Sequence, residues 1–236
     1  AVNTGLKESV HVPGLNLAPM GRGLQTAWGV PFRLADPDAR GGKTAVGTWG
    51  EAVPDRPRRV RIPAGGTFTR LFFLHTVAYS TPGAVMARIR MHYAGGAPET
   101  FEVVNGRNMF DWHRGPFNLP DAVIAWERLS GGDSGVRKLA YLSWWDNPRP
   151  DVPLRAIEVL ASEEPGYHIL VAVTGRTSPL PAAPRPEDGA ASRAELTRRI
   201  EALKGRFWEA LCRVTSPADA EKSLASITAR LFDQIV

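Results

Sequence analysis

The sequence predicts a mainly β fold, an antiparallel β-sandwich or jelly roll, followed by a C-terminal helical hairpin. The first observation is a series of short apolar runs in residues 1–177, separated by turns that use many of the 23 glycines and 20 prolines. The second is that 43% of the 236 residues are hydrophobic, which is enough for one sizeable core. The third is a change of hydrophobic period after a Pro/Ala-rich segment. We therefore expect a sandwich domain over 1–177, a linker over 178–191 and a two-helix tail over 192–236.

Seven segments of the first domain are predicted to be strands. Thr69–Val77 is a nearly continuous apolar run, which indicates a strand buried on both faces. Val85–Tyr93 alternates apolar and polar residues, and Glu99–Asn105 follows it after a Gly-containing turn, so this pair is the clearest hairpin. The remaining predicted strands are Arg58–Ile62, Lys138–Trp144, Leu154–Leu160 and Tyr167–Thr174.

The tail shows helical periodicity in two stretches. Ser192 and Glu195 are spaced as a capping box at the start of the first helix, and Ser216-Pro217 ends it. Two helices alone bury too little surface to be stable, so the hairpin packs on itself or on the sandwich, or docks a second copy or a partner protein through 192–236. The apolar stripes are Leu196, Ile200, Leu203, Phe207, Leu211 and Val214, then Leu224, Ile227, Leu231 and Ile235.

The charge pattern favours neither nucleic acid nor membrane as a partner. The formal net charge is +5, and the one basic cluster, in 56–61, interleaves with apolar residues as the exposed side of a strand does. No nucleic-acid recognition signature accompanies it, and no run is apolar enough to span a membrane. Cys212 is the only cysteine, so no intrachain disulfide forms. Because the chain begins at Ala1 rather than Met, as a processed chain does, we expect a periplasmic or extracellular protein.

Two segments after predicted strands supply candidate ligand-binding residues. Sugars present a C–H face that stacks on aromatic rings and hydroxyls that need fixed polar partners. Strand alternation points Trp144 inward and leaves Trp145 exposed. The alternative is that Trp112 and Trp144 plug the sandwich while Asp111 and Asn147 satisfy loop amides. The candidates are Trp112 and Trp145 for stacking, with Asp111, His113, Asp146, Asn147 and Arg149 for hydrogen bonding.

The residues that could serve catalysis are scattered along the sequence and form no recognised catalytic motif. Asp111 and His113, two residues apart, could chelate a metal, but the spacing matches no recognised ligand motif. His75 closes a buried strand and is read as a core histidine. No nucleophile elbow, phosphate loop or nucleotide fingerprint occurs, so we predict no catalytic residue and no cofactor. Carboxylates for glycoside cleavage are available at Glu99, Glu102, Asp111, Glu127 and Asp146, and nothing selects two of them.

Four short motifs in chain order resemble a known family. They are Gly29-Val30-Pro31-Phe32, Leu71–Thr76, Asp111-Trp112 and Trp145–Pro150. This order is similar to that of the galactose-binding-like jelly-roll domains, carbohydrate-binding modules attached to bacterial glycoside hydrolases and other exported polysaccharide-handling proteins. The resemblance covers about residues 15–174. It implies a β-sandwich in a glycan context, and a structural Ca²⁺ of the kind common in such domains, for which no ligand set is identifiable here.

These observations favour a non-catalytic carbohydrate-binding or adhesion module of a bacterial exported protein. Two other functions stay open. One is a polysaccharide-active enzyme, either a glycoside hydrolase or a lyase. The other is a structural domain that docks a partner through its helical tail. Because fold alone does not give function, the choice depends on how the candidate side chains are placed.

Overall fold

The computed structural model describes residues 2–4, 17–113, 118–129 and 137–178. Within these residues the chain is mainly β, and every strand pairing is antiparallel, as the sequence predicts. The only helical elements in this part of the chain are two 3-10 turns, η1 (Ala18–Met20) and η2 (Asp38–Arg40). Nothing among these residues forms a helix that could cross a membrane. The predicted linker, apart from Ser178, and the two-helix tail lie outside the described residues.

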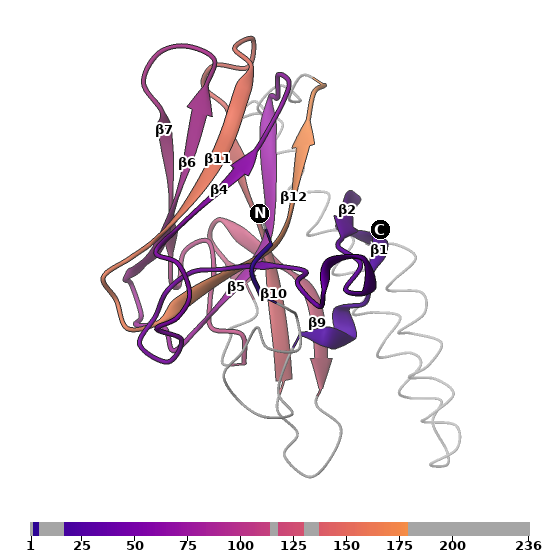
Figure 1. Cartoon of the computed structure of the whole chain (residues 1–236), viewed down its shortest axis with the longest axis vertical. Coiled ribbons are helices and arrows are strands. Elements are labelled where there is room, and N and C mark those ends of the chain that lie inside the picture. The colour runs from indigo at the N-terminus through magenta and orange to yellow at the C-terminus, as the bar shows by residue number, and fades with distance from the viewer. Residues whose placement is uncertain (1, 5–16, 114–117, 130–136, 179–236) are drawn as a thin grey trace, which may run out of the picture. The chain divides into compact units, whose positions relative to one another are not determined.

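The strands form three sheets (Figure 1). The four-stranded sheet has, in spatial order, β4 (Arg59–Pro63), β11 (Leu154–Ala161), β6 (Val85–Tyr93) and β7 (Glu99–Val104). The six-stranded sheet has β3 (Val46–Gly47), β12 (Tyr167–Arg176), β5 (Arg70–Ala78), β10 (Arg137–Asp146), β9 (Ala122–Leu129) and β8 (Asn118–Leu119). The third sheet is the hairpin of β1 (Gly23–Ala27) and β2 (Val30–Leu34).

The main core fills the space between the four-stranded and six-stranded sheets. Ile89 and Val159 from the first sheet pack with Phe73 and Leu170 from the second, and all four are buried. The apolar members of β6 alternate with Arg88, Arg90 and His92 on the other side, as the sequence pattern predicts. Burial of these two apolar faces against each other is the main force that holds the sandwich together.

A second core lies on the opposite face of the six-stranded sheet. Phe32 and Leu34 of β2 are buried against Leu74, Leu142 and Ile169 of β5, β10 and β12. The hairpin therefore covers the face of the sheet that the sandwich leaves free (Figure 1). This arrangement explains the continuous apolar run of β5, which is buried on both faces along most of its length, as expected.

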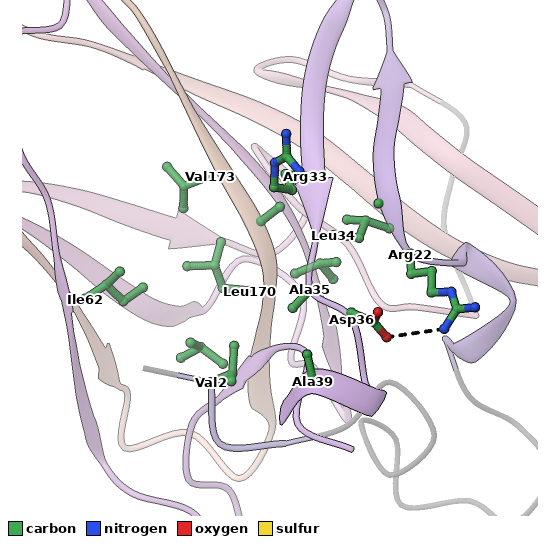
Figure 2. Close-up of a pocket in the computed structure, with 14 residues that line it drawn as sticks. Val2, Arg22, Arg33, Leu34, Ala35, Asp36, Ala39, Ile62, Leu170 and Val173 are labelled. Atoms are coloured by element: carbon green, nitrogen blue, oxygen red, sulfur yellow. Dashed lines mark hydrogen bonds and ion pairs between the residues drawn. The ribbon is translucent and has the colours of Figure 1, made fainter. Parts of the chain in front are cut away.

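The edge of the six-stranded sheet beside β12 is incomplete. The short strand β3 pairs only with Ile169 and Leu170, so no described strand continues the sheet alongside the rest of β12. Val2 and the segment Arg33–Asp36 instead line the space beside this edge. A cavity of about 750 Å³ remains between these segments (Figure 2).

Candidate functional site

The predicted site residues fall into two groups near opposite ends of β10. The carbonyl of Trp112 accepts a hydrogen bond from the Leu139 amide at 2.7 Å, close to the start of the strand. Asp146 pairs with Arg70 at its far end. Seven residues of extended chain at about 3.3 Å each separate the two places by roughly 23 Å. A single site that combines Asp111 and Trp112 with Trp145 and Asn147 is therefore contradicted.

Asp111 and Trp112 are buried and hold a loop. Trp112 is 2% exposed and belongs to the second core, so the predicted stacking role for its ring is wrong. The Asp111 carboxylate accepts hydrogen bonds from the Ser80 amide at 3.4 Å, the Ser80 hydroxyl at 3.3 Å and the His113 amide at 3.2 Å. Its Oδ1 also lies 2.6 Å from Nδ1 of His113, whose side chain is 31% exposed. These contacts match the alternative in which Asp111 satisfies loop amides.

Asn147 and Arg149 close the other end of the sandwich. The Asn147 side chain is buried, donates to the Phe68 carbonyl at 2.6 Å and accepts from the Tyr93 hydroxyl and the Arg149 amide. The Arg149 guanidinium lies 3.7 Å from the centroid of the Tyr93 ring and donates to the Ala97 carbonyl. The polar atoms of the Asn147 side chain are used within the protein, and the Arg149 guanidinium, whose side chain is 28% exposed, is held by the Tyr93 ring and the Ala97 carbonyl.

The two tryptophans of β10 are placed opposite to the prediction. Trp145 packs against the core between the sheets, on the same side of β10 as Ser143. Trp144 lies on the other face with Leu142, and is half-buried. Apolar alternation could not choose between them because both faces of β10 cover a core. Trp144 and Trp145 are both half-buried, but the Trp145 ring packs against the core between the sheets, so Trp144 is the better candidate for stacking.

Trp144 belongs to a set on the hairpin side of the six-stranded sheet that we call the aromatic face. Within it, Phe72 packs partly against the second core and the Thr174 hydroxyl donates to the Pro31 carbonyl of β2 at 2.5 Å. Across three strands, Trp144 is in register with Phe72 and Thr174. Two residues further along the sheet, a second row lies on the same face. The aromatic face comprises the rows Trp144–Phe72–Thr174 and Asp146–Arg70–Arg176.

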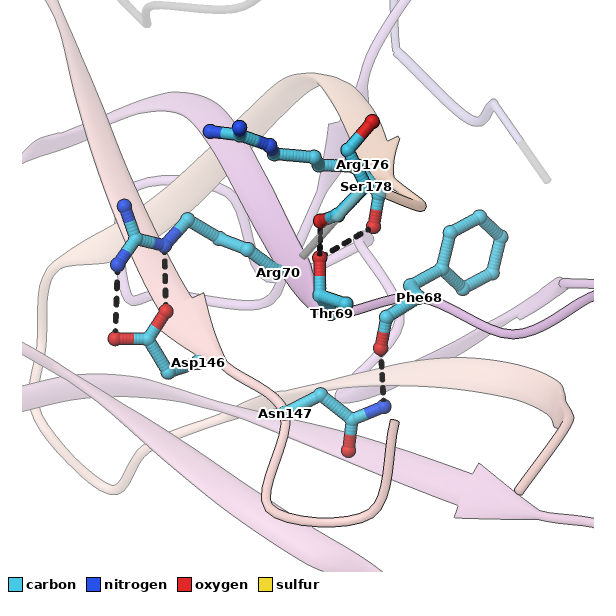
Figure 3. A network of polar contacts seen from close by, with 7 residues as sticks. All are labelled: Phe68, Thr69, Arg70, Asp146, Asn147, Arg176 and Ser178. Carbon is cyan, nitrogen blue, oxygen red and sulfur yellow. Dashed lines mark hydrogen bonds and ion pairs between the residues drawn. The ribbon is translucent and has the colours of Figure 1, made fainter. Parts of the chain in front are cut away.

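An ion pair fixes the polar row of the aromatic face (Figure 3). Arg70 donates to both carboxylate oxygens of Asp146, from Nε at 2.5 Å and from NH2 at 3.0 Å. This paired geometry holds both groups in one plane. The Arg70 guanidinium carbon is also 6.0 Å from the Trp144 ring centroid and 5.9 Å from that of Phe72. The Asp146 side chain is 54% exposed, so it is accessible at the surface.

A second polar cluster lies inside the protein, where it resembles a hydrolase relay. Ser143 Oγ is 2.8 Å from His75 Nε2, and His75 Nδ1 is 3.0 Å from His168 Nε2. All three residues are 0% exposed, so no substrate reaches the hydroxyl. Burial lowers the pKa of His75 to about 3, and burial together with His75 lowers the pKa of His168. His75 is therefore a neutral core histidine, as predicted.

The described residues supply no other chemical site that the sequence anticipated. No group of three His, Cys, Asp or Glu side chains among them could hold a metal ion. The carboxylates considered for glycoside cleavage each face a basic side chain. These contacts are Glu99–Arg149 at 4.0 Å, Glu102–Arg88 at 3.1 Å, Glu127–Arg137 at 2.9 Å, Asp146–Arg70 at 2.5 Å and Asp111–His113 at 2.6 Å.

No protein-family model and no curated protein matches the sequence. The resemblance to galactose-binding-like domains therefore stays a prediction.

Proposed function

We propose that the protein is a non-catalytic carbohydrate-binding module and that the aromatic face is its binding site. The observation that carries this proposal is the half-buried Trp144 ring beside the fixed Arg70–Asp146 pair. Phe72 extends the apolar surface next to Trp144 in register. The proposal includes a bacterial exported protein that acts in the periplasm or outside the cell, where it captures glycans or mediates adhesion.

The chemistry of the face suits a sugar ring. Indole and phenyl rings offer flat apolar surface for the C–H side of a pyranose, at little cost in conformational entropy. Asp146 accepts hydrogen bonds from hydroxyl groups, and Arg70 donates to them. Because the ion pair already holds both side chains, a ligand does not have to order them, and this preorganisation favours binding.

The test is binding of the full chain to a glycan array, followed by titration of the best glycan. Trp144→Ala removes the stacking surface, and we expect it to weaken binding about tenfold or more, or ~1.4 kcal/mol. Trp49→Ala is the matched control. Trp49 is also half-buried, and it stacks with Arg58, whose guanidinium carbon lies 3.8 Å from the ring centroid, but it lies outside the aromatic face.

Two results would contradict the proposal. The first is that the wild-type chain binds no glycan on the array. The second is that Trp144→Ala and Trp49→Ala reduce the affinity equally, because a general loss of stability would then explain both. The competing idea of a partner docked through 192–236 concerns residues outside the described part of the chain.

A further inference from the structure

The cavity beside β12 owes its existence to the shortness of β3. Leu170 still pairs with Val46 of β3, whereas Val173 is beyond the last pairing and lines the open space. Ile62 of β4, the edge strand of the other sheet, reaches the same space. With a volume of about 750 Å³, the cavity falls within the range of small-molecule sites.

The walls of this cavity are aliphatic. Leu34, Val46, Ile62, Leu170 and Val173 line it together with smaller apolar residues. No aromatic side chain is among the described residues that line it. These residues offer no flat ring for a sugar to stack on, so their chemistry differs from that of the aromatic face. An alkyl chain is the ligand group that would bury its apolar surface against such a lining.

The charges at the rim are unequal. Arg22 is already neutralised, since its guanidinium lies 3.3 Å from Asp36 and 2.8 Å from Asp38. Arg33 also lines the cavity, is exposed, and forms no ion pair with a described residue. Figure 2 shows Arg33 and the Arg22–Asp36 pair at separate places around the cavity. Among the described residues, Arg33 is thus a guanidinium at the rim without an ion-pair partner of its own, beside an apolar space.

We propose that this cavity is a second binding site, for a small amphipathic anion with an alkyl chain and one carboxylate. The chain lies against the aliphatic walls and the carboxylate pairs with Arg33, whose planar guanidinium donates two parallel hydrogen bonds to such a group. The ligand needs both the carboxylate and the alkyl chain, because an exposed ion pair alone contributes little binding free energy.

The test is calorimetric titration of the full chain with octanoate and, separately, with octan-1-ol. We expect one saturable octanoate site. Arg33→Gln should weaken octanoate about tenfold and leave octan-1-ol unchanged, because only the carboxylate uses the guanidinium. Ala39→Trp fills the cavity from its exposed rim and should weaken both ligands. Arg128→Gln is the charge-matched control on β9, and should change neither.

Three outcomes would overturn this proposal. Absence of saturable octanoate binding is the first. Equal losses in Arg33→Gln and Arg128→Gln are the second, because they would show attraction by net charge alone. The third is that Ala39→Trp binds both ligands as tightly as the wild type does, since the ligands would then bind outside this cavity. None of these measurements involves the aromatic face, so the two proposals can fail independently.

Discussion

Acid is expected to destabilise the protein through its buried histidine pair. His75 is 0% exposed and holds its pKa at about 3, whereas an unfolded histidine titrates near 6.5. Between these pH values the histidine is protonated in the unfolded chain but neutral in the native state. The free energy of unfolding therefore falls as the pH drops from about 6.5 towards 3. Above 6.5 both states are neutral at this residue and the effect vanishes.

The size of the effect follows from the pKa difference. Each pH unit inside this window costs about 1.36 kcal/mol for one such group. Lowering the pH from 7.5 to 5.0 crosses about 1.5 units of the window, so His75 alone accounts for roughly 2 kcal/mol of lost stability. His168 acts in the same direction, because its pKa is also lowered by burial. This is a large share of a typical domain stability of about 5–15 kcal/mol.

Urea unfolding at pH 7.5 and pH 5.0, followed by tryptophan fluorescence, measures this loss. His75→Gln keeps a hydrogen-bonding side chain but cannot titrate, so its loss between the two pH values should be about 2 kcal/mol smaller than that of the wild type. Ser143→Ala is the control. It removes the 2.8 Å contact with His75 Nε2 and should lower stability by about 1 kcal/mol at both pH values alike. Equal pH dependence in His75→Gln and the wild type would refute the reasoning.

Two further predictions concern the loops that close the sandwich. Asn147→Ala should cost about 2–3 kcal/mol, because it leaves the Phe68 carbonyl and the Tyr93 hydroxyl without their buried partner; thermal unfolding measures it, and a cost below about 0.5 kcal/mol would disprove the closing role. Gly166→Ala places a Cβ against the backbone carbonyl oxygens of Tyr79 and Ala78 and should lower the free energy of unfolding by about 1–3 kcal/mol or more in the same assay. Gly95→Ala has open space around it and should be nearly neutral, so similar effects of the two substitutions would count against the packing argument.

The sequence predicts strands best where one pattern dominates. β6 matches its predicted bounds because apolar residues alternate with Arg88, Arg90 and His92 from Ala87 to Tyr93. β1 was not predicted, since its sequence Gly23–Ala27 is short and mostly polar, and only its pairing with β2 makes it a strand. The sequence does not predict β9, because Ala122–Leu129 begins with five apolar residues and shows no clear period. In the structure, a register shift interrupts its pairing with β10. Tertiary pairing, which no local pattern encodes, decides such segments.

The candidate site shows the same limit more strongly. Asp146 could be selected from its place at a strand end, but Arg70 and Phe72 come from a strand more than seventy residues away, and only the register of β5 against β10 brings them together. Trp112 and Asn147 were selected for the right residue types and proved to be buried, because the same residues also close the ends of a β-sandwich. Residue type indicates that a side chain can bind a sugar, whereas burial decides whether it is available.

Both faces of the six-stranded sheet are covered along its middle, so few of its side chains can contact a ligand. Leu74 and Leu142 lie under the β1–β2 hairpin, while Phe73 faces the sandwich core, so the middle of β5 and β10 is closed on either side. Trp144 and Asp146 continue the Leu142 face towards the end of β10, where burial decreases from one residue to the next. On this face of β10, the half-buried Trp144 and the exposed Asp146 are therefore the side chains that a ligand can reach, whereas Leu142 is closed beneath the hairpin.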